Sequence, residues 1–311
     1  MKLKIKQQIL MEHLNNAIKG VSSKNLIPIL TGIKFELKKE GLYLYASDTD
    51  VSIRTFISAD KLTCIEEGSI VIGGKYIVEI VKKLPNTDIT MEVIDGYKLI
   101  ISTDNTEFNL NGINPNEFPN LDLDETKEPI VIHNNVFKDI VNQTVFATSQ
   151  NESRPLLTGI NFRIINGELE VLATDSYRLA RKLVTIDKEG DSDINIVIPG
   201  KNLLELVKMI DDNGTIEMHL FSNKILFKYE NMIFLSRLLS GTYPTTSSII
   251  PNSFNIELEC NFSDLFNMID RASLLTSDRE KNTIKLSLDK NKLMISSNSP
   301  EIGKVEEKIE V

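Results

Sequence analysis

The sequence RPLLTGINFRIINGELEVLATDSYRLARKLV at residues 154–184 nearly repeats PILTGIKFELKKEGLYLYASDTDVSIR at residues 28–54. The two stretches align without a gap, from Pro28 with Pro155 to Arg54 with Arg181, at a constant offset of 127 residues. Repetition of this kind decides the architecture before any single motif does, because each copy predicts one structural unit.

The repetition continues outside these stretches. GKYIVEIVKKL (74–84) aligns with GKNLLELVKMI (200–210), and FPNL (118–121) aligns with YPTT (243–246). We therefore predict three domains. They cover residues 1–126, residues 127–252 and residues 253–311, and the third holds only the first half of the pattern.

Within each unit we predict the order helix–strands–helix–strands, which is an α+β fold with helices covering one face of the sheets. Apolar residues at helical spacing predict five helices, whereas alternating apolar residues between turn signals predict the strands. The predicted helices span residues 6–19, 73–84, 134–149, 200–210 and 262–273.

The composition indicates a globular protein with a formal net charge of −9. No apolar run approaches the roughly 18–20 residues that cross a bilayer, and the N-terminus lacks the apolar core of a signal peptide, so we predict a cytoplasmic protein. Cys64 and Cys260 are far apart and predict free thiols, neither a disulfide nor a metal site.

Motifs for catalysis or metal binding are weak. Gly73-Gly74-Lys75 lacks the spacing of a phosphate-binding loop. Asp48 and Asp50 could form a metal pair, but a turn explains them better, because position 50 becomes Tyr177 in the second copy. A hydrolase that uses Asp48 and Asp175 remains an alternative with little support.

The three histidines stand apart in the sequence, at His13, His133 and His219. A second alternative is a repeat-built protein-interaction scaffold without nucleic-acid binding.

Three tandem units, the motif LTGI…ASD/ATD…R and the paired GK helices resemble the beta subunit of bacterial DNA polymerase III, the sliding clamp family. The resemblance implies three similar domains per chain and a homodimeric ring with helices lining the hole and sheets outside. It implies a non-catalytic processivity factor for DNA replication, without cofactor or metal. The implied partners are duplex DNA, the polymerase III catalytic subunit, the clamp loader and other clamp-motif proteins.

Charge is distributed as a sequence-independent DNA-binding ring requires. The five predicted helices sum to +3, whereas the rest of the chain carries −12. The resemblance places a DNA-contacting basic residue in the loop after the first helix, where this chain has Lys24. The predicted DNA-facing residues are Lys24, Lys75, Asn151, Lys201 and Lys208.

The resemblance also implies a pocket for partner peptides between the second and third domains. The second-domain wall is predicted to comprise Leu157, Thr174, Tyr177, Arg178, Leu179, Pro244 and Ile249. Ser176 departs from the family pattern, which commonly has glycine there. The third-domain wall lies in the family's last strand, which this sequence does not include, so weakened peptide binding is expected.

The family's ring closes between the first domain of one chain and the third domain of the other. The residues predicted at this interface are Lys75, Ile80, Phe108, Leu110, Arg271, Leu274 and Leu275. Because the third unit has about half the expected length, we expect a truncated form that dimerises poorly.

Overall fold

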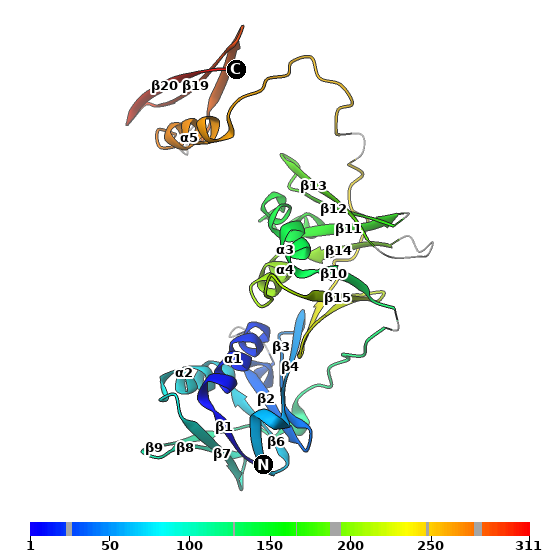
Figure 1. Cartoon of the computed structure of the whole chain (residues 1–311), viewed down its shortest axis with the longest axis vertical. Coiled ribbons are helices and arrows are strands. Elements are labelled where there is room, and N and C mark those ends of the chain that lie inside the picture. The colour runs from blue at the N-terminus through cyan, green and yellow to red at the C-terminus, as the bar shows by residue number, and fades with distance from the viewer. Residues whose placement is uncertain (23–26, 127, 166, 187–193, 247–248, 277–281) are drawn as a thin grey trace. The chain divides into compact units, whose positions relative to one another are not determined.

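The computed structural model of the chain describes residues 1–22, 27–126, 128–165, 167–186, 194–246, 249–276 and 282–311 (Figure 1). Its contacts divide the chain into two compact units, residues 1–243 and residues 244–311, which are described separately. The predicted boundary at residues 126–127 therefore falls inside the first unit and stays a prediction.

Five α-helices occur in the described part of the chain, in the five regions where the apolar spacing predicts them. Their bounds are α1 (Gln7–Ala17), α2 (Gly74–Lys83), α3 (Asn134–Asn142), α4 (Gly200–Val207) and α5 (Phe262–Ser273). The third helix is shorter than predicted. The Thr144 hydroxyl donates a hydrogen bond of 2.7 Å to the Ile140 carbonyl, and a 3₁₀ turn, Val145–Ala147, follows.

A five-stranded antiparallel sheet belongs entirely to the first repeat, in the order β5-β1-β7-β8-β9. Its strands are β1 (Lys2–Lys6), β5 (Leu62–Glu66), β7 (Asp88–Ile94), β8 (Lys98–Thr103) and β9 (Thr106–Asn111). The predicted order of elements began with a helix and lacked β1. In the structure, a strand precedes the first helix of each of the first two repeats, β1 in the first and residues 130–133 in the second.

An eight-stranded sheet joins the two repeats in the order β10-β15-β16-β17-β4-β3-β2-β6. The first repeat contributes β2 (Gly32–Lys38), β3 (Gly41–Ser47), β4 (Val51–Ser58) and β6 (Gly68–Gly73). The second contributes β10 (Ile130–His133), β15 (Thr215–Leu220), β16 (Lys224–Tyr229) and β17 (Met232–Arg237). The β4–β17 pair, with Ile53 opposite Phe234, is the seam between the repeats (Figure 1).

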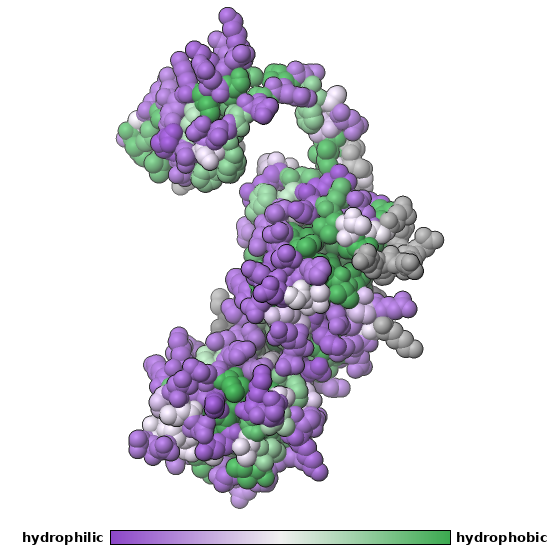
Figure 2. Space-filling view, viewed as in Figure 1, coloured by the Kyte–Doolittle hydropathy of each residue, from purple (hydrophilic) through white to green (hydrophobic). Residues whose placement is uncertain are grey.

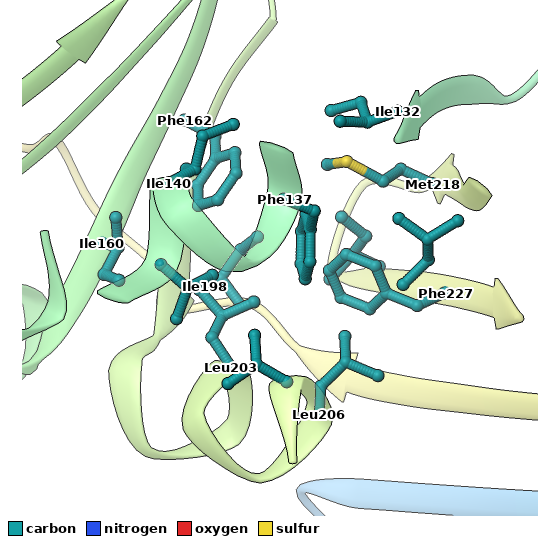
Figure 3. Close-up of a cluster of buried hydrophobic side chains, with 14 of the residues drawn as sticks. Ile132, Phe137, Ile140, Ile160, Phe162, Ile198, Leu203, Leu206, Met218 and Phe227 are labelled. Atoms are coloured by element: carbon teal, nitrogen blue, oxygen red, sulfur yellow. The ribbon is translucent and has the colours of Figure 1, made fainter. Parts of the chain in front are cut away.

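The second repeat has its own four-stranded sheet in the order β13-β12-β11-β14. Its strands are β11 (Gly159–Ile165), β12 (Glu168–Thr174), β13 (Leu179–Thr185) and β14 (Ile194–Pro199). Side chains from the facing sheets meet those of α3 and α4 in one core, where Phe137, Phe162, Leu203 and Phe227 are fully buried (Figure 3). This burial holds each helix against its sheets.

The second unit contains α5 and a three-stranded sheet in the order β18-β19-β20. Its strands are β18 (Lys285–Asp289), β19 (Lys292–Ser299) and β20 (Gly303–Glu310). Met268 and Ala272 of α5 pack on Leu293 and Ile295 of β19. Before α5, the extended segment 253–261 alternates apolar and polar residues, but among the described residues no strand pairs with it. The stretch of chain that leads to α5 shows both hydrophobic and hydrophilic surface (Figure 2).

Candidate nucleic-acid and partner interfaces

Two of the predicted DNA-facing lysines occupy matching places in the two repeats. Lys75 is the second residue of α2 and Lys201 is the second residue of α4, and both side chains are exposed. Ile77 and Leu203, two residues further along, are fully buried and anchor these helices to their cores. Neither lysine forms an ion pair with any described residue, so both ammonium groups are available to an anion.

Lys208 lies beyond the end of α4 and is differently placed. Its ammonium lies 2.7 Å from a carboxylate oxygen of Glu205, whose other oxygen lies 3.1 Å from Lys19 Nζ. The hydrogen bond from Lys208, followed by that from Lys19, lowers the pKa of Glu205. The positive charge of Lys208 is therefore partly neutralised within the protein, whereas those of Lys75 and Lys201 are not.

Asn151 lies in an exposed turn after α3. Its backbone N–H donates to Ser149 Oγ at 3.0 Å, and its side-chain oxygen accepts from the Ser153 N–H at 2.9 Å. The side-chain oxygen of Asn151 is thus hydrogen-bonded within the turn, and its amide NH₂ is the group that can reach a phosphate. Lys24 lies outside the described residues.

The two aspartates of the repeated motif form the same turn twice. Asp48 Oδ1 accepts from the N–H groups of Asp50 and Val51, and Asp175 Oδ1 accepts from those of Tyr177 and Arg178. Backbone hydrogen bonding, led by that of Tyr177, lowers the pKa of Asp175. Both carboxylates serve the backbone, which confirms the turn interpretation and removes the basis for a hydrolase.

The predicted peptide-binding wall is organised around Arg178. Its Nε lies 3.0 Å from Asp175 Oδ2, and its guanidinium stands over the Phe146 ring, 5.6 Å from the ring centre. The Thr174 hydroxyl donates a 2.7 Å hydrogen bond to the Arg178 carbonyl. Arg178 is thus held at an exposed edge by three neighbours, and Tyr177 beside it is 97% exposed.

The apolar members of this wall differ in accessibility. Leu157 is only 6% exposed and belongs to a small core with Leu172, Val197 and Tyr243, against which the half-buried Leu179 packs. Leu157 therefore supports the wall from beneath more than it lines an open recess. Pro244 and Ile249 are exposed but belong to the second unit, so they are described apart from the others.

Sequence reasoning missed two residues that shape this wall. The buried Tyr243 hydroxyl accepts the Thr174 N–H at 3.1 Å, and burial raises the pKa of that phenol. Phe146 lies beneath the Arg178 guanidinium. The match of YPTT with FPNL marked position 243 as a repeated aromatic, and that was the available signal.

The predicted dimer residues fall on both units. Ile80, Phe108 and Leu110 are half-buried and pack at the margin of the first core. Phe108 and Leu110 lie on β9, which pairs only with β8 among the described strands. On α5, Arg271 Nε donates to Glu307 Oε1 at 2.8 Å. Leu274, just past α5, is 74% exposed, and Leu275 is half-buried.

His219 is not isolated as the sequence suggested. It lies 3.2 Å from Glu217, and Glu125 completes a group of three that could hold a metal ion. The Lys228 ammonium lies 2.7 Å from Glu125 and 3.8 Å from Glu217, and the Thr126 N–H donates to His219 Nδ1 at 3.0 Å. Lys228 thus supplies the positive charge beside these carboxylates. The contacts hold residues 125–126, which precede β10, against the eight-stranded sheet.

Both cysteines, Cys64 and Cys260, are free thiols. Among the described residues, no helix is both long and apolar enough to cross a membrane.

Comparison with known proteins agrees with this architecture along the whole chain. Residues 1–122, 131–245 and 247–311 match the N-terminal, central and C-terminal domains of the DNA polymerase III beta subunit. The beta sliding clamp of Bacillus subtilis (strain 168) is 42% identical, over 99% of this chain and 84% of that protein. That of Staphylococcus aureus (strain N315) is 38% identical, over 100% of this chain and 84% of that protein.

Solved structures give the same result. The crystal structure of the DNA polymerase sliding clamp from Bacillus subtilis superposes with a TM-score of 0.97, covering 99% of this chain and 83% of that chain at 42% identity. The DNA polymerase III beta chain from Streptococcus pneumoniae TIGR4 gives 0.95 at 34% identity, with 99% and 83% covered. The chain therefore belongs to the DNA polymerase III beta subunit family and is a non-catalytic DNA sliding clamp.

Proposed function

We propose that the exposed side of α2 and α4 faces duplex DNA and that the charge of Lys75 and Lys201 attracts its phosphates. The observation that carries this proposal is their equivalence. Each repeat places an exposed lysine, with no ion-pair partner among the described residues, at the second position of the equivalent helix. A sliding protein needs attraction to phosphates without reading of bases, and isolated lysines on repeated helices provide that. Lys208, Asn151 and Lys24 are proposed to add to this surface.

Lys201→Glu tests this assignment. Reversing one phosphate-contacting charge should weaken binding to duplex DNA by about tenfold at low salt, and the slope of log K against log salt should fall by about one. Fluorescence anisotropy with a labelled duplex measures both quantities. Lys39→Glu, an equal charge change in the exposed β2–β3 turn, is the matched control. Equal losses in both variants would show that only net charge matters.

Partner peptides are proposed to dock on the wall around Arg178. Its guanidinium is fixed by Asp175 and Phe146 yet remains more than half exposed, which suits recognition of a peptide carbonyl or carboxylate. Tyr177 offers an aromatic surface beside it. Leu179 is proposed to take an apolar anchor of the peptide, and Pro244 and Ile249 are proposed as peptide contacts within the second unit. The polymerase III catalytic subunit and the clamp loader are the proposed owners of such peptides.

The chain is proposed to form a homodimer through β9 and the C-terminal end of α5. An edge strand with unpaired backbone groups pairs readily with another strand, and Leu274 offers exposed apolar surface. Sedimentation velocity should show a concentration-dependent dimer that Leu274→Arg weakens, while Leu286→Arg, at an exposed leucine of β18, leaves it intact. Because a weak dimer is expected from the short third domain, the comparison is made at the highest concentration that stays free of aggregates. Equal losses of dimer in Leu274→Arg and Leu286→Arg would contradict this interface.

A further inference from the structure

A cavity of about 340 Å³ lies between strands β2–β4 and the connecting segment 118–124. It is separate from the proposed DNA-facing lysines and from the Arg178 wall. Its floor carries the charged residues Lys34, Glu36, Lys38 and Arg54, and Phe118, Leu121 and Leu123 belong to its roof. A volume of this size accommodates a small organic molecule.

The floor is built by strand register. Lys34 of β2 lies opposite Tyr45 of β3, which lies opposite Arg54 of β4, so the three side chains stand in one row on one face of the sheet. Lys34 Nζ stands 5.7 Å from the centre of the Tyr45 ring. Two cations therefore flank one aromatic ring at the bottom of the cavity.

Among the described residues, no partner satisfies the Nε of Arg54. Its Nε is buried and hydrogen-bonds nothing, and the guanidinium forms no ion pair with any described residue. Leaving a buried charged donor unsatisfied is unfavourable, and such a group in a native protein calls for an explanation.

The second repeat shows what is missing. Arg181, the counterpart of Arg54, places its Nε 2.7 Å from Glu170 Oε1. The counterpart of Glu170 in the first repeat is Tyr43, which carries no negative charge. The carboxylate of Glu36 does not replace it, because Lys38 lies 3.3 Å from that carboxylate and the Tyr45 hydroxyl donates to it at 3.2 Å.

We propose that this cavity binds a small phosphate monoester, with the phosphate against Arg54 and Lys34 and an apolar body against the half-buried Leu121. Arginine recognises phosphate oxygens with two parallel hydrogen bonds. The cavity contains three cations against the carboxylates of Glu36 and Asp124, so an added anion is favoured. A phosphate monoester, with about two negative charges at neutral pH, satisfies this balance better than a carboxylate.

Isothermal titration of the full chain with phenyl phosphate, benzoate and inorganic phosphate tests the proposal. We expect saturable one-to-one binding of phenyl phosphate. Benzoate should bind more weakly for lack of charge, and inorganic phosphate more weakly for lack of an apolar body. Arg54→Gln should weaken the binding of phenyl phosphate at least about tenfold, because a charge-assisted hydrogen bond is lost. Arg181→Gln, at the position already paired with Glu170, should bind as the parent does.

Three results would overturn the proposal. The first is that phenyl phosphate shows no saturable binding at millimolar concentration, and the second is that Arg54→Gln and Arg181→Gln lose the same affinity for it. The third result is that phenyl phosphate binds no more tightly than inorganic phosphate. The thermal midpoint of each variant reports folding. If Arg54→Gln fails to fold, Lys34→Gln replaces it, because Lys34 faces the same cavity and is partly exposed. Its expected loss is several-fold, and unchanged binding in Lys34→Gln would then reject the site.

Discussion

Residues 28–54 and 155–181 form the same structure twice, in different surroundings. Each begins with a 3₁₀ turn, Pro28–Thr31 or Pro155–Thr158, and continues through three antiparallel strands with an aspartate turn before the third. The third strand of the first copy, β4, pairs with β17 inside a continuous sheet. That of the second copy, β13, pairs only with β12 among the described strands.

Side chains follow this difference. Val51 and Ile53 on β4 are both buried. Of the equivalent positions after the second turn, Arg178 is exposed and only the small Ala180 is buried. A charged edge resists unwanted strand pairing and remains available to a partner. The repeated sequence sets the local structure, and the neighbouring strand decides whether the third strand becomes an internal seam or an open surface.

The largest effect is expected at the seam. Ile53→Ala removes a fully buried side chain between the two repeats and should lower the free energy of unfolding by about 2–5 kcal/mol. Leu183→Ala on the open strand β13, where the side chain is 42% exposed, should cost less than about 1 kcal/mol. Urea denaturation measures both, and similar losses would mean that the two strands are equally buried in solution.

The exposed Arg178, at the open edge of the second copy, is expected to contribute to peptide binding. Arg178→Ala should weaken binding of a fluorescein-labelled clamp-motif peptide about tenfold, because it removes a held guanidinium donor. The control is Arg181→Ala, three residues further on and paired with Glu170. Fluorescence polarisation gives both affinities. A peptide that binds the Arg178→Ala variant as tightly as the parent would remove this residue from the docking surface.

Both turns contain a residue with a positive φ at the same position, but the residue type differs between the two copies. Thr49 has φ 85° and Ser176 has φ 79°, a region that favours glycine. Thr49→Gly should therefore raise stability by up to about 1 kcal/mol. Ser176→Gly should gain about half as much, because it also loses the 3.2 Å hydrogen bond from Arg154. Thermal denaturation ranks the two, and destabilisation by both would show that neither turn is strained.

The smallest expected effect is on the pH dependence of stability that arises from Asp175. Backbone hydrogen bonds lower the pKa of Asp175 in the folded state. A lowered carboxyl pKa stabilises the fold above the unfolded value of about 4, and the benefit is lost as pH falls through the folded value. Asp175→Asn should cost less than about 1 kcal/mol at pH 7, and the difference from the parent should shrink on acidification. A difference that grows below pH 4 has the wrong sign for this account.

The helices and hairpins were predictable because their signals are local. Apolar spacing placed α2 and α4, and the repeat offset assigned the second aspartate turn from the first. The strands β1 and β10 were missed because they are short and pair with distant segments. Leu3, for example, lies opposite Cys64 and Met91. A five-residue strand next to a helix carries little periodicity of its own.

The candidate sites were predictable only in part, because some of their contacts are local in the sequence and others join distant segments. Arg178 and Asp175 are three residues apart and appear together in the motif. The hydrogen bond between Thr174 and Tyr243 spans 69 residues, and that between Thr126 and His219 spans 93. Contacts of this kind arise from how the repeats are joined, so the sequence pattern does not specify them.

Retention on circular and on cut DNA tests whether the protein encircles the duplex. The protein is assembled on a nicked circular plasmid with a clamp loader and ATP, and the plasmid is then cut once. We predict that the protein stays on the intact circle through gel filtration in moderate salt and leaves after the cut, because a clamp slides off a free end. Equal retention on circular and linear DNA would show a surface binder and contradict the account.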